Sequence, residues 1–409
     1  MDSAITPKSA PMLTVRRLQA HGLLLALALW SIYGWVLATP TLRDRNGLLK
    51  GTDFLHFYTL GSLALDHRGP ELYNMQAQSE LAQQKVPQAG HLLYVPLYGP
   101  QVSLLFAPLA ALPYAAALTL WLVFNTVLYA LCCYLIWKTC PHLQAEASTV
   151  FILVFAYPAF AQLIAWGQTS ALALACFTAA YLAQRSRNLF LAGLAIGSLI
   201  FKPQLGLAAA LVFLLAREWR VIVGALSAAA AQLSAGWAYY GTAAMRDYFF
   251  HLVHLGQTFP QLEPRPYQMH SLRAFWAMLL PWTHIAFTLY MASALGVLAI
   301  TFRCWNSNAP LSLRYSALLL ATVLVSPHLT VYDLLILAPA FLFLADHAVE
   351  NRIHSEAPRL GPLLYGCYAL PLIGPLTYWT HVQLSIPALL ALLWTIRRLP
   401  TTASGAVGS

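Results

Sequence analysis

Apolar runs recur along almost the whole chain, and they constrain the fold more than any single motif. A spanning helix needs roughly 20 apolar residues, and fewer where the helix is broken. Because the mean hydropathy is +0.62 and only 9% of the residues are charged, the sequence predicts an all-α polytopic membrane protein with about 12 transmembrane helices. The predicted spans lie near residues 20–39, 115–137, 148–165, 169–184, 189–201, 205–216, 221–240, 284–302, 315–326, 331–345, 361–377 and 383–396.

The basic residues predict an orientation and exclude one class of function. The formal net charge is +9, but the Arg residues lie in short loops between apolar runs, where they set topology, so nucleic-acid binding is rejected. Both termini are then expected to be cytoplasmic. Residues 22–38 have features of a signal peptide, but apolar segments follow throughout, which favours an uncleaved first helix. The pairs expected inside are Arg16/Arg17, Arg185/Arg187, Arg217/Arg220, Arg303/Arg314, Arg352/Arg359 and Arg397/Arg398.

One segment and two loops depart from simple alternation. Residues 97–113 are apolar, but counting them as a span would move the later Arg pairs outside, so a re-entrant or interfacial helix is predicted there. The outer loops are then residues 40–96 and 241–283. In the first loop, residues 53–66 predict an amphipathic helix that rests on the membrane surface through Phe54, Leu55, Tyr58 and Leu65. Residues 1–400 are expected to form one transmembrane domain, followed by a disordered tail at 401–409.

Metal and disulfide chemistry are not indicated. The six cysteines form no C-x-x-C pair, and none falls in the two outer loops. His251 and His254 have half the spacing of a metal site, but no third ligand follows at an obvious distance. A pair formed by Asp53 and His56 is conceivable, although a hydrogen-bonding or surface histidine is the simpler interpretation of His56. No metal and no cofactor are therefore expected.

Ionisable residues are costly near the bilayer, so the few that remain are candidates for function. Asp53 opens the first outer loop. It either caps an interfacial helix or, partly desolvated beside Phe54 and Phe57, acts as a general base, and the two roles are compatible. Gln168 lies in a polar break between two apolar runs, and it either belongs to a plain turn or hydrogen-bonds a sugar hydroxyl.

Two further breaks carry a cation and a histidine. Lys202 lies at the outer end of a span, where it either snorkels to the surface or contacts a phosphate together with the free backbone N–H groups of the helix that Pro203 opens. His328, in Ser326-Pro327-His328, is either an interface histidine or a donor to a phosphate leaving group. Asp333 is expected to pair with Lys202, with His328 or with a helix terminus.

These residues also carry a resemblance that covers roughly residues 50–345. In order and spacing the chain resembles glycosyltransferase family 87, which includes mannosyltransferases that use polyprenyl-phosphate mannose and belongs to the GT-C superfamily. The chain departs from the family pattern at Tyr98-Gly99-Pro100, where relatives often carry consecutive prolines. The matching pieces are Asp53-Phe54 with Tyr58, Gly69 with Leu72-Tyr73-Asn74, Pro100 to Pro113, Gly167-Gln168, Lys202-Pro203-Gln204, and Ser326-Pro327-His328 with Tyr332-Asp333.

The resemblance implies a GT-C-like fold and a hexosyltransferase of the inner membrane whose active site faces the periplasm or cell exterior. It implies a polyprenyl-phosphate sugar donor, mannose by analogy, and a lipid or glycan acceptor. Asp53 is the expected base of an inverting transfer, and Lys202 and His328 are expected to bind the donor phosphate. Gln168, Gln204, Tyr58, Tyr332 and Asp333 are expected to contact substrate. The alternative is a lipid or solute transporter with a site near Gln168, Lys202 and Asp333.

Overall fold

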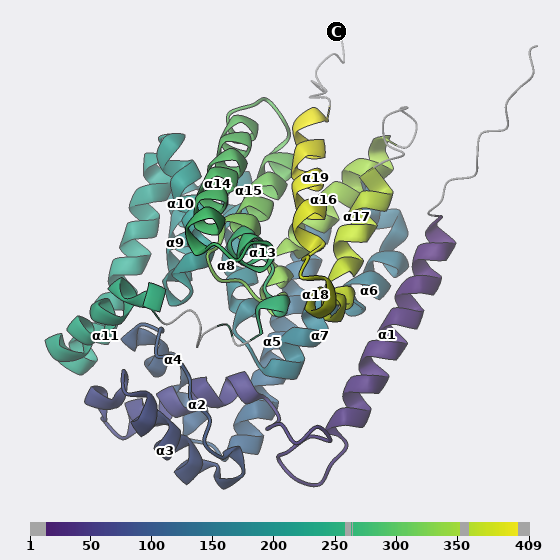
Figure 1. Ribbon diagram of the computed structural model, residues 1–409. Coiled ribbons are helices and arrows are strands. Elements are labelled where there is room, and N and C mark those ends of the chain that lie inside the picture. The colour runs from purple at the N-terminus through teal and green to yellow at the C-terminus, as the bar shows by residue number, and fades with distance from the viewer. Residues whose placement is uncertain (1–13, 258–262, 264, 352–359, 400–409) are drawn as a thin grey trace, which may run out of the picture.

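The protein is described by a computed structural model over residues 14–257, 263, 265–351 and 360–399 (Figure 1). Within these residues the regular structure is helical, and the only β features are two isolated bridges. The predicted tail at 401–409 lies outside the described residues. The helices of the first half are α1 Val15–Leu37, α2 Thr52–Leu65, α3 Met75–Lys85, α4 Pro100–Ala110, α5 Tyr114–Trp137, α6 Ala147–Phe155, α7 Pro158–Trp166, α8 Ser170–Arg185, α9 Leu189–Gly197 and α10 Pro203–Leu215.

The second half adds helices of very different length, and short 3-10 turns lie between some of them. The α9 helix continues as η4 Ser198–Phe201, and η6 Val331–Leu337 leads directly into α16. The helices are α11 Trp219–Val253, α13 Leu272–Leu279, α14 Thr283–Trp305, α15 Leu311–Val325, α16 Ala338–Glu350, α17 Leu360–Ala369, α18 Gly374–Thr380 and α19 Ser385–Arg398. Inside α11 the backbone of Gly241 is not helical, at φ 77° and ψ −177°, so the helix turns where the predicted span at 221–240 ends.

The described helices confirm a multi-pass membrane protein. Six helical segments are long and apolar enough to cross a membrane, and the pair Pro141–Phe155 and Pro158–Trp166, bent by 41°, makes a seventh if it is counted as one span. The other predicted spans fall on shorter helices, namely α8, α9 with η4, α10, α15 and α19. The count of twelve therefore stays a prediction, as does the re-entrant path of α4.

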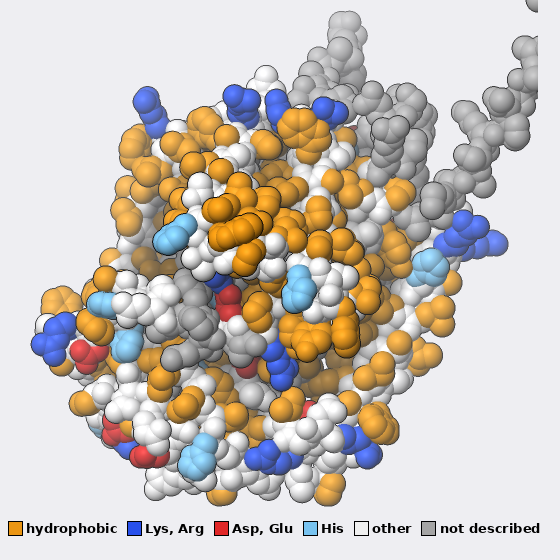
Figure 2. All heavy atoms as spheres, in the orientation of Figure 1, with side chains coloured by type: hydrophobic (Ala, Val, Ile, Leu, Met, Phe, Trp, Pro, Cys, Tyr) orange, Lys and Arg blue, Asp and Glu red, His pale blue; other side chains and the backbone are white. Residues whose placement is uncertain are grey.

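Side-chain contacts join helix ends that lie near the basic residues expected on the cytoplasmic side. Near the start of α1, the Gln19 amide donates to Thr149 Oγ1 at 2.9 Å. At the end of α8, Arg185 donates to the carbonyl of Thr139 at 3.4 Å, and the backbone of Leu143 donates to Asp346 near the end of α16 at 3.0 Å. Figure 2 shows Lys and Arg side chains along the upper edge, hydrophobic side chains below them, and both charges around the lower end.

The helix predicted at 53–66 is correct in position but not in environment. The α2 helix is buried in the protein, and Phe54, Leu55 and Tyr58 are at most 5% exposed, so the prediction that they rest on the membrane surface is wrong. Of the four residues only Leu65 is exposed. The reason is that α4 packs along α2, a long-range contact that the local pattern does not encode. Figure 1 shows α2, α3 and α4 gathered at the end opposite the chain terminus marked C.

The close packing of α2 on α4 depends on Gly61. A Cβ at this position would lie 2.5 Å from the carbonyl oxygen of Phe106, a backbone atom that cannot move aside cheaply. We therefore expect Gly61→Ala to lower the stability by about 1–3 kcal/mol, as overpacking does in other cores. Gly296→Ala is the matched control, because a Cβ at Gly296 in α14 meets nothing within 4 Å. Chemical unfolding in detergent measures both, and an equal response of the two variants would contradict the packing argument.

Candidate active site

Two glycines let the start of α2 approach the break between α7 and α8. Gly51 precedes α2 with φ 65°, and Gly167 ends α7 with φ 70°, a left-handed conformation that glycine adopts without strain. Space is equally limiting, because a Cβ on Gly167 would lie 2.8 Å from Cβ of Phe54. The indole of Trp121 in α5 fixes the break by donating to the carbonyl of Gly167 at 2.8 Å. The next residue, Gln168, is thereby held against α2.

This approach brings Asp53 and Gln168 together as the first pair of the site. The Gln168 amide donates to Asp53 Oδ2 at 2.7 Å, and its own oxygen accepts from the backbone N–H of Thr169 at 3.2 Å. Gln168 is therefore engaged at both ends of its amide. Asp53 is not the helix cap considered from the sequence, because the N-cap position belongs to Gly51 and Asp53 lies in the first turn.

A buried ion pair forms the second part of the site. Lys202 lies between η4 and α10, and its Nζ is 2.8 Å from Asp333 Oδ1, with both side chains at most 4% exposed. The hydroxyl of Ser170, the first residue of α8, donates to the same carboxylate oxygen at 2.5 Å. The ammonium also lies 5.2 Å from the ring centre of Tyr332. Asp333 is thus the partner of Lys202, one of the roles predicted for it.

The other oxygen of Asp333 shapes the local backbone. Asp333 Oδ2 accepts from the backbone N–H and the hydroxyl of Thr330. The bond from the Thr330 backbone is one half of the capping box that starts η6, and in the other half the Thr330 side chain accepts from the backbone N–H of Asp333. Asp333 is therefore satisfied on both oxygens, as a buried carboxylate must be. Its geometry fits an anchor for Lys202 better than a direct contact with substrate.

The electrostatics of Asp53 differ from those of Asp333. Burial raises the pKa of Asp53 to about 6, although the hydrogen bond from Gln168 and the charge of Lys202 act in the opposite direction. A carboxylate with a pKa near neutrality is suited to accept a proton and release it again. Lys202 therefore influences both carboxylates of the site, one by direct contact and one through its field.

His328 belongs to a neighbouring ion cluster. Its Nδ1 lies 2.9 Å from Glu263 Oε1, and Glu263 also pairs with Arg273. Arg273 in turn donates to the carbonyl of Pro327 at 2.5 Å, so Glu263 and Arg273, both within residues 241–283, hold His328 in place. Burial alone would raise the pKa of Glu263, but the hydrogen bond with His328 and the charge of Arg273 lower it overall.

Three other predicted contact residues have different surroundings. The hydroxyl of Tyr58 donates to the carbonyl of Leu112 at 2.8 Å, and its ring packs on Tyr114, so Tyr58 lies in an aromatic core rather than in the polar cluster. Gln204 is partly exposed in the first turn of α10, and its side chain has no hydrogen bond among the described residues. Tyr332 lies beside Lys202 and close enough to Asp53 to favour its ionised form.

Sequence reasoning missed two tyrosines, Tyr94 and Tyr98, that lie near Asp53. The hydroxyl of Tyr94 donates to the carbonyl of Thr52 at 2.5 Å, and burial together with the charges of Asp333 and Asp53 raises the pKa of Tyr98. The sequence feature that could have indicated them is the occurrence of two tyrosines in the Pro- and Gly-containing segment at 90–100. Ser170, Glu263 and Arg273 were also missed, since each meets the site through a contact between residues far apart in sequence.

The residues described contain no group of three or more His, Cys, Asp or Glu side chains placed to hold a metal ion. Of the two histidines with metal-like spacing, His251 stacks on Tyr73 and His254 contacts the carbonyl of Phe250. Chemically, the site combines one carboxylate able to exchange a proton with a lysine and a histidine nearby, an arrangement suited to a reaction with an anionic leaving group.

Comparison with known proteins gives one match. The model of glycosyltransferase family 87 matches residues 97–327, which is more than half of the chain. Gln168, Lys202 and Gln204 lie inside the matched region, whereas Asp53, Tyr58, His328, Tyr332 and Asp333 lie outside it. No curated protein and no solved structure matches.

The buried ion pair generates a stability prediction. Lys202→Met removes one partner and leaves a buried, unpaired Asp333, so we expect a loss of about 3–5 kcal/mol. Asp333→Leu should also destabilise the protein, because it strands Lys202 and removes the capping box at Thr330. The double variant should lose less than the sum of the two single losses, because no charge is then left alone. Chemical unfolding of the three variants measures the coupling, and strictly additive losses would refute it.

Proposed function

The chain belongs to glycosyltransferase family 87, and from this premise we propose that it transfers a sugar from a polyprenyl-phosphate donor to a lipid or glycan acceptor. The family makes the protein a membrane glycosyltransferase and weighs against the transporter considered from the sequence. We further propose that the sugar is mannose, that the protein lies in the inner membrane, and that the site faces the periplasm or cell exterior. The gathering of basic residues at the opposite end supports this orientation.

In the proposed mechanism Asp53 is the general base. It takes the proton of the acceptor hydroxyl while the hydroxyl oxygen bonds to the anomeric carbon, and the bond from that carbon to the phosphate oxygen breaks on the opposite face. The transfer therefore inverts the anomeric configuration. Gln168 holds one oxygen of Asp53 and so acts as a positioning residue rather than as the sugar contact expected from the sequence. The Asp53–Gln168 pair beside Lys202 is the observation that carries the proposal.

The departing lipid phosphate is stabilised by Lys202 and His328 in this mechanism. Charge-assisted hydrogen bonds to a developing anion are often the largest catalytic contribution. The Asp333 pair holds the Lys202 ammonium at a fixed position, so little reorganisation is needed when the phosphate leaves. Since Glu263 contacts Nδ1 of His328, the Nε2 edge is the one that reaches the phosphate.

The direct test is transfer by the purified protein. Polyprenyl-phosphate mannose with a radiolabelled sugar is incubated with the protein and a lipid extract of the source membranes. Labelled product of inverted anomeric configuration supports the proposal. Transfer only from a donor with a different sugar contradicts mannose, and no transfer from any polyprenyl-phosphate sugar contradicts the donor class.

Replacement of the base separates chemistry from binding. Asp53→Asn cannot accept a proton, so turnover should fall by about 100- to 10,000-fold, the range for loss of a general base. Donor affinity should not fall, because Asp53 acts on the acceptor and its charge only opposes the approach of the donor phosphate. Asp66→Asn at the other end of α2 is the matched control, since Asp66 is a partly exposed carboxylate paired with Lys85, and its turnover should stay near wild type. Similar turnover in both variants would remove Asp53 from the mechanism.

The pKa of Asp53 predicts the pH dependence. The base must be ionised, so kcat/KM should rise with pH through about 6 and level off above it. Gln168→Leu removes a hydrogen bond that favours the carboxylate, so this limb of the profile should move to higher pH. Gln162→Leu is the control, because Gln162 accepts a hydrogen bond from Trp166 instead. If the pH at which kcat/KM rises is the same in Gln168→Leu as in the wild type, a group other than Asp53 controls that rise.

A further inference from the structure

Within the part of the chain that the structure describes, His56 is a buried histidine whose ring lacks a hydrogen-bond partner. Its side chain is 5% exposed, and neither ring nitrogen has a partner among the described residues. Such groups are rare, because a buried donor or acceptor left unsatisfied is costly. The contrast with His270 is informative. His270 is 1% exposed, but its Nδ1 lies 2.8 Å from the hydroxyl of Ser385.

The cover over His56 is a single extended segment. The imidazole lies edge-to-face against Tyr94, with ring centres 4.8 Å apart, and 5.5 Å from the ring centre of Tyr98. Residues 92–97 between these contacts have neither helix nor strand. Side-chain hydroxyls tie both tyrosines to the rest of the fold, from Tyr94 to the carbonyl of Thr52 and from Tyr73 to the carbonyl of Tyr98. Few hydrogen bonds therefore need to break for this cover to move.

His56 lies one helical turn from Asp53. The two residues are three apart in α2 and so lie on the same face of the helix. Tyr94 and Tyr98, from the segment that covers His56, both lie near Asp53, and Tyr98 also lies near Asp333. In an inverting transfer, the acceptor approaches the anomeric carbon from the side opposite the phosphate. In the proposed mechanism Asp53 takes the proton of the acceptor hydroxyl, so His56, one turn along the same face of α2, is placed beside the acceptor.

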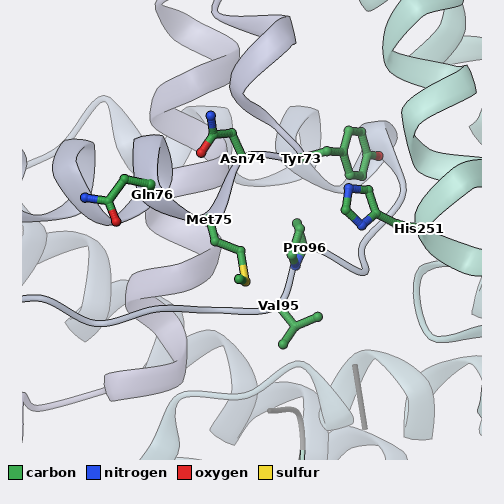
Figure 3. A pocket seen from close by; sticks show the side chains of 7 residues that line it. All are labelled: Tyr73, Asn74, Met75, Gln76, Val95, Pro96 and His251. Carbon is green, nitrogen blue, oxygen red and sulfur yellow. The ribbon is translucent and has the colours of Figure 1, made fainter. Parts of the chain in front are cut away.

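A hollow lies against the same covering segment. It has a volume of about 450 Å³ and is lined by Tyr73, Asn74, Met75, Gln76, Val95, Pro96 and His251 (Figure 3). This volume is within the range of about 300–1,000 Å³ that is usual for small-molecule sites. Figure 3 shows Tyr73 and His251 side by side, with Val95 and Pro96 below them, and the two rings stack with centres 5.5 Å apart. Aromatic faces beside amide side chains suit the apolar faces and hydroxyls of a sugar.

We propose that His56 is a hydroxyl-binding residue of the acceptor subsite, which opens toward this hollow when the segment at 92–98 moves away from α2. The inference rests on the proposed transferase function and names the acceptor group that the site takes, a hydroxyl-bearing glycan. Burial lowers the pKa of His56 to about 3, so the imidazole is neutral. A neutral imidazole offers one donor and one acceptor, which matches a hydroxyl group and does not match an anionic phosphate.

The first test needs no substrate. Diethyl pyrocarbonate transfers its carbethoxy group to a nitrogen of neutral histidine, with release of ethanol and carbon dioxide. If the segment opens, His56 should react in the folded protein, whereas the equally buried His270 should react only after unfolding. Exposed His91 provides the positive control. Peptide mass spectrometry follows all three residues, and a His56 as unreactive as His270 overturns the proposal.

The second test separates acceptor binding from structure. His56→Phe keeps an aromatic ring against Tyr94 but removes both nitrogens, so the KM for the acceptor should rise by about 5- to 10-fold, as expected for a lost hydrogen bond. His56→Gln, which can donate and accept, should recover part of this loss. Donor affinity should not change, and the Tm of His56→Phe should equal or exceed the wild-type value. The lipid extract of the source membranes supplies the acceptor, and its concentration is varied to obtain the KM.

The outcomes distinguish the two proposals. Normal transfer with an unchanged acceptor KM in His56→Phe overturns the role of His56 and leaves the transferase standing. An equal change in donor affinity also overturns it, because His56 would then lie on the phosphate side. If the wild-type protein transfers no sugar, the proposed function fails, and the carbethoxylation result alone decides whether His56 becomes accessible in the folded protein.

Discussion

The buried pair of Lys202 and Asp333 is the interaction on which the site depends. Removing two charges from water costs several kcal/mol per ion, so such a pair persists only with good geometry and additional hydrogen bonds. Here Ser170 and the capping box at Thr330 supply those bonds. The pair thereby joins the starts of α8, α10 and η6, which are distant in sequence. The elements that carry Gln168, Lys202 and Tyr332 are fixed relative to one another by this one group of contacts.

The functional residues lie where helices are interrupted. Gln168 follows the left-handed Gly167, Lys202 follows a 3-10 turn, and Asp333 lies in the first turn of another. A continuous helix satisfies its own backbone and presents only side chains, whereas an interruption leaves backbone groups that need polar partners. In a chain this apolar, polar residues and interruptions are therefore expected together. The same reasoning explains why short apolar helices such as α10 and α15 occur beside the site.

Much of this arrangement can be predicted from the sequence, because it is encoded locally. Apolar runs locate the helices, and the breaks at Gly167-Gln168, Lys202-Pro203 and Pro327-His328 stand out as polar interruptions. Contacts across long separations are not encoded in this way. The burial of α2 under α4 and the pairing of His328 with Glu263, 65 residues away, arise from packing between whole segments. For this reason a helix was predicted correctly at 53–66 but was wrongly placed on the membrane surface.

The charges of the site also limit how the proposed mechanism can work. Asp53 and the donor phosphate are both negative, so the ionisation of one disfavours the approach of the other. The charge of Lys202 favours the ionised form of Asp53, because it lowers the pKa of that carboxyl, and it also attracts the phosphate. Asp333 neutralises much of this charge. A free lysine would hold Asp53 ionised but make it a weaker base. The paired lysine leaves the pKa of Asp53 at about 6, where the carboxylate is ionised at neutral pH and still basic enough to take a proton from a hydroxyl group.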